Sequence, residues 1–276
     1  MVADIVTNEP LIRVQHLRKT YVQRRPFSRE KFLVRALDGI DLVIPRGSSF
    51  ALVGESGSGK STLALCMARL EPPTEGKIWF EGEDLFSLSG PALMQVRRRI
   101  QLIFQDTAAA LNPRFSAEEV IIEPLRIQSV GTRAEQHDRA VHLMEKVGLP
   151  SAWLSRRPHQ FSGGQRQRLA IARALALQPR LLILDEAFTG LDLSIQAQMV
   201  ALLQSLQSLE KLTYVFISHD LSLMAYVADE IAIMHLGRIV EQGEPGRLFS
   251  HPCRPETRAL LEAIPGRHSA LSFGQS

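Results

Sequence analysis

Apolar positions follow strand-like patterns before about residue 90 and again from residue 181 onward. Residues 11–17 (LIRVQHL) alternate between apolar and polar positions, which predicts a strand with one buried face. Residues 49–53 and 181–184 are almost continuously apolar, which is typical of strands buried on both faces. Shorter strands are predicted at residues 42–44, 77–80, 213–217, 231–234 and 238–241, the last two as a hairpin around Leu236 and Gly237.

Helix-like patterns occupy much of the remaining sequence. A glycine-rich break at residues 54–60 precedes the first of them. Between about residues 91 and 177 helical patterns dominate, and we interpret this stretch as a mostly helical insertion. Residues 23–31 predict a polar, basic loop, and residues 245–276 predict a tail of short helix and loop. Further helices are predicted at residues 61–70, 194–209 and 221–227.

Composition narrows the class of protein. A length of 276 residues suits one large α/β domain or two intimate subdomains. The hydrophobic share of 45% and the charged share of 22% are those of an ordinary globular protein. A net charge of +3 is too small to argue for a nucleic-acid surface. The densest basic cluster, at residues 96–100 (VRRRI), favours a solvated helix face over a phosphate-backbone patch.

Cysteine usage and targeting patterns exclude several other classes. The two cysteines, Cys66 and Cys253, are too few for a disulfide framework, and the apolar neighbours of Cys66 predict a buried core residue. Such sparse usage fits a reducing compartment. The first residues, MVADIVTNEP, lack the pattern of a signal peptide, and no window approaches the roughly 18 apolar residues that span a bilayer. We therefore expect any role at a membrane to depend on other subunits.

The glycine-rich segment at residues 54–62 (GESGSGKST) fits the phosphate-binding pattern G-x-x-x-x-G-K-[ST]. It follows an apolar strand and opens a helix, as this pattern requires. The glycines let backbone N–H groups turn onto phosphate oxygens, Lys60 would reach the β- and γ-phosphates, and Ser61 would bind Mg²⁺. A glycine-rich turn without nucleotide is the alternative. The predicted ATP contacts are Gly54, Glu55, Ser56, Gly57, Ser58, Gly59, Lys60, Ser61 and Thr62.

Two adjacent carboxylates end the apolar run at residues 181–184. A phosphate-loop site needs one acidic group for Mg²⁺ and one for the attacking water. Successive residues at a strand end point in different directions, so Asp185 can serve Mg²⁺ and Glu186 the water. The alternative, a strand end with two solvated acids, loses weight because the phosphate loop is present.

A second phosphate-binding pattern lies at residues 161–165 (FSGGQ), just ahead of a predicted helix. With this segment the chain resembles the ATP-binding subunits of ABC transporters, over roughly residues 11–265, because FSGGQ is similar to the LSGGQ signature of that family. In the family, the signature contacts the γ-phosphate of an ATP held by the phosphate loop of a second subunit. Two ATPs are thereby sandwiched between two subunits, head to tail.

This resemblance implies that part of the chain serves the ATP of a partner subunit. The implied contacts in trans are Ser162, Gly163, Gly164, Gln165 and Asp192. Asp192, in the segment TGLD, matches the D-loop aspartate of the family, which communicates across the dimer.

Three further positions match motifs of the family. Tyr21 resembles the aromatic residue that stacks on adenine, although a core-facing tyrosine is the alternative. Gln105 matches the Q-loop glutamine, which senses Mg²⁺ and water where the membrane subunit docks. His219 matches the switch histidine at the γ-phosphate. The resemblance thus assigns catalysis to Glu186, His219, Lys60 and Gln105, and Mg²⁺ binding to Ser61, Gln105 and Asp185.

The fold implied by the resemblance is α/β. It consists of a P-loop NTPase core with a mixed β-sheet, an N-terminal antiparallel β subdomain and an inserted α-helical subdomain. Residues 1–90 and 178–244 would form the ATP-binding core with the β subdomain. Residues 91–177 would form the helical signature subdomain, and residues 245–276 a C-terminal tail.

Within the transporters, the chain is most similar to the peptide and nickel import group. The segments FQDTAAALNPR and HPCRPETRALLEAIPG resemble stretches of that group, but residues 253–256 stand where a single tyrosine is expected. Residues 185–192 read DEAFTGLD where the group commonly reads DEPTSALD. Some relatives carry a four-thiolate iron–sulfur cluster, which the two cysteines of this chain cannot form.

The predicted function is the ATP-hydrolysing subunit of an importer for peptides, nickel or metal chelates, peripheral on the cytoplasmic face of the membrane. The predicted partners are a second, paralogous ATPase subunit, two transmembrane permease subunits and an extracytoplasmic substrate-binding protein, without nucleic acid. The alternative is a soluble ABC ATPase acting on nucleic acid or the ribosome. Chromosome-type members separate the two phosphate motifs by a very long coiled coil, however, and ribosome-type members carry two cassettes per chain.

Overall fold

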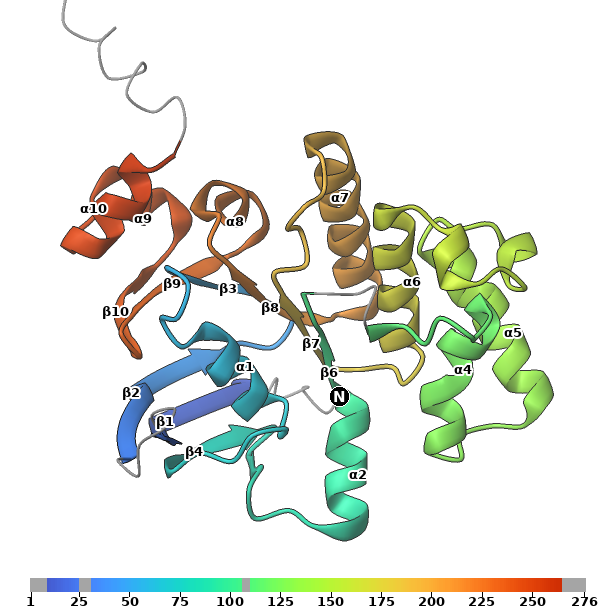
Figure 1. Ribbon diagram of the computed structural model, residues 1–276, viewed down its shortest axis with the longest axis horizontal. Helices are drawn as coiled ribbons and strands as arrows, with labels where there is room; N and C mark the ends of the chain where they lie inside the picture. Colours follow the sequence, from blue (N-terminus) through green and yellow to red (C-terminus); the bar gives the residue numbers. More distant parts are fainter. Residues whose placement is uncertain (1–8, 25–30, 106–109, 265–276) are drawn as a thin grey trace, which may run out of the picture. The chain divides into compact units, whose positions relative to one another are not determined.

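The computed structural model describes residues 9–24, 31–105 and 110–264 (Figure 1). The chain splits into two compact units: the first comprises Met1–Leu88 and His219–Ser276, and the second comprises Ser89–Ser218. Most of the basic loop expected at residues 23–31 lies outside the described residues, as do residues 106–109 of the FQDTAAALNPR segment.

The first unit contains a four-stranded antiparallel sheet in the order β2-β1-β4-β5. One face is apolar and buried, as the alternation at residues 11–17 predicts. The strand predicted at residues 11–17 is longer in the structure and ends at Arg24. Register shifts around His16, whose φ is 47°, interrupt the alternating pattern but do not end the strand. The four strands are β1 (Ile12–Arg24), β2 (Lys31–Ile44), β4 (Glu75–Phe80) and β5 (Glu83–Asp84).

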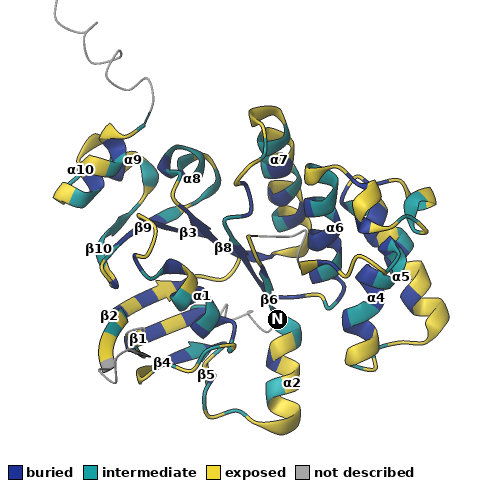
Figure 2. Ribbon diagram, in the orientation of Figure 1, coloured by how far each residue is buried: buried dark blue, intermediate teal, exposed yellow. Residues whose placement is uncertain are grey.

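The first unit also holds a mixed group of strands. β3 (Ser49–Val53) pairs in parallel with β9 (Glu230–His235), which forms an antiparallel hairpin with β10 (Arg238–Gly243), as predicted. Every residue of β3 is buried, as Figure 2 shows, which explains its continuous apolar run. The helices of this unit are α1 (Lys60–Met67), α8 (Leu221–Val227), α9 (Pro245–Ser250) and α10 (Pro255–Glu262).

Three parallel strands form the centre of the second unit. β7 (Leu181–Asp185) lies between β8 (Thr213–Ser218) and β6 (Ile100–Ile103), and all three run in parallel. β7 is buried until its last residue, so the chain leaves the core at Asp185. β6 is a strand inside the stretch that helical patterns dominate, and the sequence did not single it out.

The other elements of the second unit are helices. α4, α5 and α6 pack against one another, and each begins with a capping box in which an N-cap hydroxyl and a Glu or Gln at the third helical position bond reciprocally to the backbone. The helices are α2 (Gly90–Arg99), α4 (Ala117–Ile127), α5 (Arg133–Lys146), α6 (Gly163–Leu175) and α7 (Leu193–Glu210). Within the described part of the chain, no helix combines the length and apolarity needed to span a membrane.

Two smaller sequence expectations have structural answers. The basic cluster lies on α2, where Arg97 is exposed but the Arg98 guanidinium donates to the side chain and the carbonyl oxygen of Gln128, so the helix face is only partly solvated. Cys66 is buried, as predicted, and burial raises the pKa of its thiol to about 12. Cys253 is exposed.

A single carboxylate on β10 holds the start of the C-terminal helix α10. Glu241 accepts hydrogen bonds from the backbone N–H of Cys253 at 2.9 Å and of Arg254 at 3.1 Å, and from the Thr257 hydroxyl at 2.5 Å. Partial burial raises the pKa of Glu241, but the hydrogen bonds from Thr257, Cys253 and Arg254 outweigh it and lower the pKa below 4.5. The ionised carboxylate therefore stabilises the position of the start of α10 against β10.

The start of α10 should become more mobile when the Glu241 side chain is removed or protonated. A depressed folded-state pKa stabilises the structure above the ordinary value of 4.5, and this stabilisation is lost as the pH falls below that value. We expect Glu241→Ala at neutral pH, and acidification of the unmodified protein, to speed amide exchange at Cys253 and Arg254, after correction for intrinsic rates. Glu262→Ala, at the exposed end of α10, is the matched control. Equal protection in both variants would contradict the role of Glu241.

Candidate functional site

The predicted site residues are divided between the two units. Tyr21, residues 54–62 and His219 belong to the first unit. The second unit holds Gln105, Ser162, Gly163, Gly164, Gln165, Asp185, Glu186 and Asp192.

The phosphate loop joins β3 to α1 and approaches its neighbours too closely for side chains at its ends. A Cβ atom at Gly54 would lie 2.2 Å from the carbonyl oxygen of Met234, and one at Gly59 would lie 2.3 Å from that of Ala36. Gly59 also has a φ of 107°, a conformation that residues with a Cβ rarely adopt. Both ends of the loop therefore require glycine, because the neighbouring carbonyl groups leave no room for a side chain.

The β9–β10 turn braces the loop from outside. Gly237 donates its backbone N–H to the carbonyl oxygen of Ser58 at 2.9 Å, and its own carbonyl oxygen accepts from Asp38 of β2 at 2.9 Å. The loop is thus tied to two strands that are remote from it in sequence. Because these bonds use backbone groups only, they fix the loop without occupying its inner surface.

Lys60 is held inside the loop. Its side chain is buried, and Nζ donates to the carbonyl oxygens of Gly54 and Glu55, both at 2.8 Å. The hydroxyl of Ser58 lies 3.4 Å from the same ammonium group. A buried cation in a glycine-lined loop at a helix start has the chemistry of a phosphate site, so these residues fit the phosphates of ATP.

The predicted Mg²⁺ ligands have the oxygen-donor chemistry that suits an ion bound largely through phosphate oxygens. No group of three or more His, Cys, Asp or Glu side chains in the described part of the chain could hold a metal by itself. Mg²⁺ in nucleotide sites typically takes one or two protein ligands together with phosphate oxygens and waters. The hydroxyl of Ser61, exposed in the first turn of α1, and the carboxylate of Asp185 are oxygen donors of this kind.

Two predicted residues of the first unit lie at the protein surface. Tyr21, on β1, is half-buried and does not belong to the core, and the ammonium of Lys19 lies 4.9 Å from its ring centre. Its contact with adenine stays a prediction. His219 is exposed just before α8, whose N-terminus is capped by the Asp220 carboxylate, which accepts from the backbone N–H of Leu223 at 3.0 Å.

Asp185 and Glu186 follow β7 in the second unit, and both are half-buried. Glu186 adopts a φ of 51°, which is uncommon for a residue with a side chain. Its backbone N–H donates to the carbonyl oxygen of Ile217 on β8 at 2.9 Å. Backbone strain of this kind often accompanies functional residues, and here it turns the chain sharply as it leaves the sheet.

The signature segment forms the N-terminus of α6. Ser162 is the N-cap: its hydroxyl accepts from the backbone N–H of Gln165 at 3.4 Å, and the Gln165 side chain accepts from the N–H of Ser162 at 2.9 Å. Ser162 and Gly163 are exposed, and a Cβ atom at Gly163 would meet nothing within 4 Å. The helix therefore begins with exposed backbone and a positive dipole end.

The second unit brings the signature and the D-loop together. Asp192 caps α7 by accepting from the backbone N–H of Ile195 at 2.9 Å, and a Cβ atom at Gly164 would lie 2.7 Å from Cγ2 of that isoleucine. The starts of α6 and α7, both predicted to act in trans, are thus in contact. Gln105, the remaining prediction in this unit, is exposed after β6.

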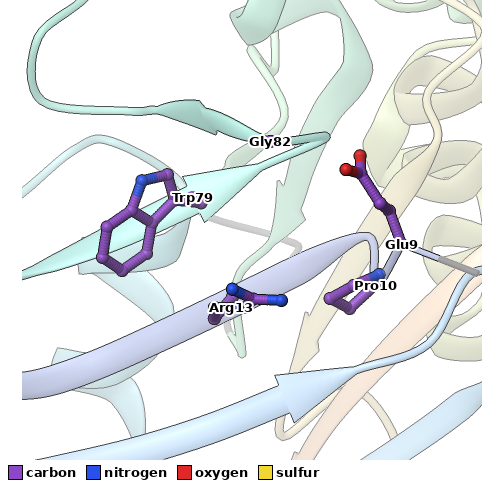
Figure 3. Close-up of a pocket in the computed structure, with 5 residues that line it drawn as sticks. All are labelled: Glu9, Pro10, Arg13, Trp79 and Gly82. Atoms are coloured by element: carbon purple, nitrogen blue, oxygen red, sulfur yellow. The ribbon is translucent and has the colours of Figure 1, made fainter.

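Described residues of the first unit line pockets at its surface. One, of about 210 Å³, is lined by the cross-strand pair Arg13 and Trp79 together with Glu9, Pro10 and Gly82 (Figure 3). It contains none of the predicted residues.

The other pocket, of about 270 Å³, lies between the phosphate-loop residue Glu55, the end of β9 and the start of α10. Glu55 is therefore the one predicted residue that lines either pocket.

Comparisons with known proteins identify the family to which the chain belongs. A family model described as ABC transporter matches residues 37–189, a span that includes the phosphate loop, the signature and the acidic pair. The chain belongs to the ABC transporter family. As a member, it is an ATP-binding cassette and an ATPase.

Relatives and solved structures of this family cover most of the chain. It is 42% identical to the dipeptide transport ATP-binding protein DppF of Escherichia coli, over 95% of this chain and 78% of that protein. It is also 42% identical to the oligopeptide transport ATP-binding protein AppF of Bacillus subtilis, over 93% and 79%. A dimeric ATP-binding cassette bound to ADP and phosphate aligns with a TM-score of 0.74 and 29% identity, over 85% of this chain and 98% of that one. The predicted ABC ATPase fold is confirmed.

Sequence motifs did not reveal two residues that contact the predicted site. Gly237 bonds to the phosphate loop through its backbone, and its place as a glycine in the predicted hairpin turn was the signal that the sequence offered. Thr189 donates its hydroxyl to Oε2 of Glu186 at 2.7 Å. The glycine directly after Thr189 indicates a turn, but the pattern of residue types does not specify this side-chain contact.

Replacing Gly59 should destabilise the protein more than replacing Gly57. Both glycines have positive φ, but an added Cβ meets the Ala36 carbonyl at Gly59 and nothing within 4 Å at Gly57. We expect Gly57→Ala to cost about 1–2 kcal/mol of conformational strain. Overpacking should add about 1–3 kcal/mol for Gly59→Ala. Thermal unfolding without nucleotide measures both, and equal midpoints would contradict the close approach.

Proposed function

We propose that the chain is the ATP-hydrolysing subunit of an importer that takes up peptides through separate membrane subunits. The observation that carries this proposal is the complete, ordered set of phosphate loop, Q-loop glutamine, signature, acidic pair, D-loop aspartate and switch histidine in one chain. Relatives named for dipeptide and oligopeptide transport, aligned over more than nine-tenths of the chain, favour peptides as cargo. These relatives are named for peptide transport and not for nickel or a metal chelate.

ATP would bind to the phosphate loop of the first unit. Backbone N–H groups at the start of α1 and the ammonium of Lys60 face the phosphates, and Tyr21 stacks on the adenine. Ser61, Gln105 and Asp185 would hold Mg²⁺. When bound, this ion neutralises charge on the phosphate oxygens.

The signature would complete the nucleotide site of a second subunit. Ser162 and Gly163 are exposed at the start of α6, Gly164 follows them, and Gln165 keeps that helix end capped. Asp192 lies beside them at the start of α7. ATP contacts on both subunits would close the dimer, and loss of the γ-phosphate would open it.

Hydrolysis would follow from groups on this chain. Glu186 accepts the proton of a water that attacks the γ-phosphorus, while the bond between this phosphorus and the bridging oxygen breaks. Lys60 and His219 stabilise the negative charge that develops on the phosphate oxygens.

The assembly would contain further subunits. We propose a second ATPase subunit, a paralogue that pairs with this chain, together with two transmembrane permease subunits and an extracytoplasmic substrate-binding protein. The chain would act peripherally on the cytoplasmic face of the membrane. The net charge of +3 and the transport names of the relatives do not favour the alternative, an ATPase acting on nucleic acid or the ribosome.

Glu186→Gln should abolish hydrolysis and leave ATP binding intact. The amide keeps the size and hydrogen-bonding reach of the carboxylate but cannot take the proton from water. We expect kcat to fall by about 10²–10⁴-fold, the range typical of general-base catalysis, with ATP affinity changed by less than about twofold. Phosphate release and equilibrium ATP binding measure the two quantities. Glu145→Gln, a change at an exposed glutamate on α5, is the control. Near-normal turnover by Glu186→Gln would contradict the role of Glu186 as the general base.

Gly163→Asp should block dimer closure without impairing the chain's own phosphate loop. Gly163 has room for a side chain, whereas one at Gly164 would strike Ile195 of the same chain. A carboxylate there suits the helix start but repels the phosphate of the partner. Gly163→Asn, of the same shape and neutral, is the control. ATP-dependent association with the second ATPase subunit, followed by light scattering, should be lost in Gly163→Asp and retained in Gly163→Asn. Loss of ATP binding by the isolated chain would contradict action in trans.

A further inference from the structure

The turn after β7 departs from the sequence that the peptide and nickel import group commonly carries. Here Glu186 is followed by Ala187, Phe188, Thr189 and Gly190, in place of Pro-Thr-Ser-Ala. Ala187 and Phe188 thus stand where the group has proline and threonine, whereas Thr189 keeps a hydroxyl where the group has serine. The geometry of these residues shows what the altered segment does.

The backbone of this turn is fixed on both sides of Glu186. The N–H of Glu186 donates to Ile217 on β8 at 2.9 Å, and the N–H of Thr189 donates back to the carbonyl oxygen of Glu186 at 3.1 Å. Glu186 itself occupies the left-handed region, with φ at 51°. The turn therefore reverses the chain within residues 186–189 and places the Thr189 side chain next to that of Glu186.

Phe188 anchors the turn to the core. It is 5% exposed, and the centre of its ring lies 6.0 Å from the centre of the Phe216 ring on β8. Its carbonyl oxygen accepts from the side chain of Gln196 on α7 at 3.2 Å. With the residue before it held in this way, Thr189 has little freedom to move relative to β7, although its own side chain is exposed.

The hydroxyl of Thr189 donates to Oε2 of Glu186 at 2.7 Å. Hydrogen bonds to an ionised acceptor are short and stronger than neutral ones. A glutamate side chain has three rotatable bonds, and holding it in one rotamer costs conformational entropy that a fixed donor offsets. Thr189 thus restrains the carboxylate that is proposed to take the proton from water.

We infer that Thr189 is a positioning residue for ATP hydrolysis, which holds the Glu186 carboxylate in the orientation that meets the attacking water. The inference rests on the proposed role of Glu186. It adds a residue that acts through Glu186 and makes no claim on the nucleotide. Positioning of this kind affects the chemical step and leaves ground-state binding of ATP unchanged.

Thr189→Val removes the hydroxyl and keeps the branched shape, and Thr189→Ser keeps the hydroxyl and removes the methyl group. In the fully assembled transporter, we expect the valine variant to lose about tenfold in kcat, which corresponds to about 1.4 kcal/mol. The KM for ATP, the ATP affinity and the unfolding midpoint should stay close to those of the unmodified protein. The serine variant should retain kcat within about twofold. Thr189→Ala is the second variant if the valine does not fold.

A double variant separates positioning from a structural role. If Thr189 acts through Glu186, then adding Thr189→Val to Glu186→Gln should change the residual turnover by less than about twofold, because the two effects are not additive. If Thr189 had a purely structural role, Thr189→Val would lower turnover by the same factor in the unmodified protein and in Glu186→Gln.

Three outcomes would overturn the inference: full kcat in Thr189→Val, a raised kcat in that variant, or an equal loss in the valine and serine variants. Failure of the proposed function can be told apart from failure of this inference. It would appear as normal turnover in Glu186→Gln, regardless of the turnover of the Thr189 variants.

Discussion

The close approach of the phosphate loop to two backbone carbonyls is the constraint on which the first unit depends. Neither Gly54, against Met234, nor Gly59, against Ala36, leaves room for a side chain. Those carbonyls belong to β9 and β2, so the shape of the loop is set by the strands around it as much as by its own sequence. The parallel pairing of β3 with β9 and the bond from Gly237 to Ser58 maintain this spacing. The loop can therefore surround Lys60 while its inner surface stays lined with backbone.

Elements with a strong local pattern could be predicted from the sequence, and elements defined by their partners could not. The apolar runs at residues 49–53 and 181–184 are strands because both faces are buried. β1 was predicted too short, because its irregular pairing around His16 disrupts the alternation that identifies a strand. β6 escaped prediction because its four residues follow a basic helix directly, and only its pairing with β7 distinguishes it from the end of that helix.

The candidate site divides in the same way. Residues of contiguous motifs, such as Lys60 and Ser162, were identifiable because phosphate chemistry requires them at fixed spacing. Their supports come from distant segments, as with Ala36 beside Gly59, or from side chains whose role depends on a particular turn, as with Thr189 beside Glu186. The fold of the main chain determines such contacts, and a pattern of residue types along the sequence carries little trace of them.

The two cysteines differ sharply in reactivity. The thiol of Cys66 is buried and has a pKa raised to about 12, so it stays protonated and shielded at neutral pH, whereas Cys253 is exposed. A thiol-directed fluorophore or spin label would therefore attach at one position of the unmodified chain, without prior removal of the other cysteine. That position directly precedes α10, where its backbone N–H is bonded to Glu241. The chain thus has a natural attachment point from which the mobility of its C-terminal helix can be recorded while nucleotide is bound and turned over.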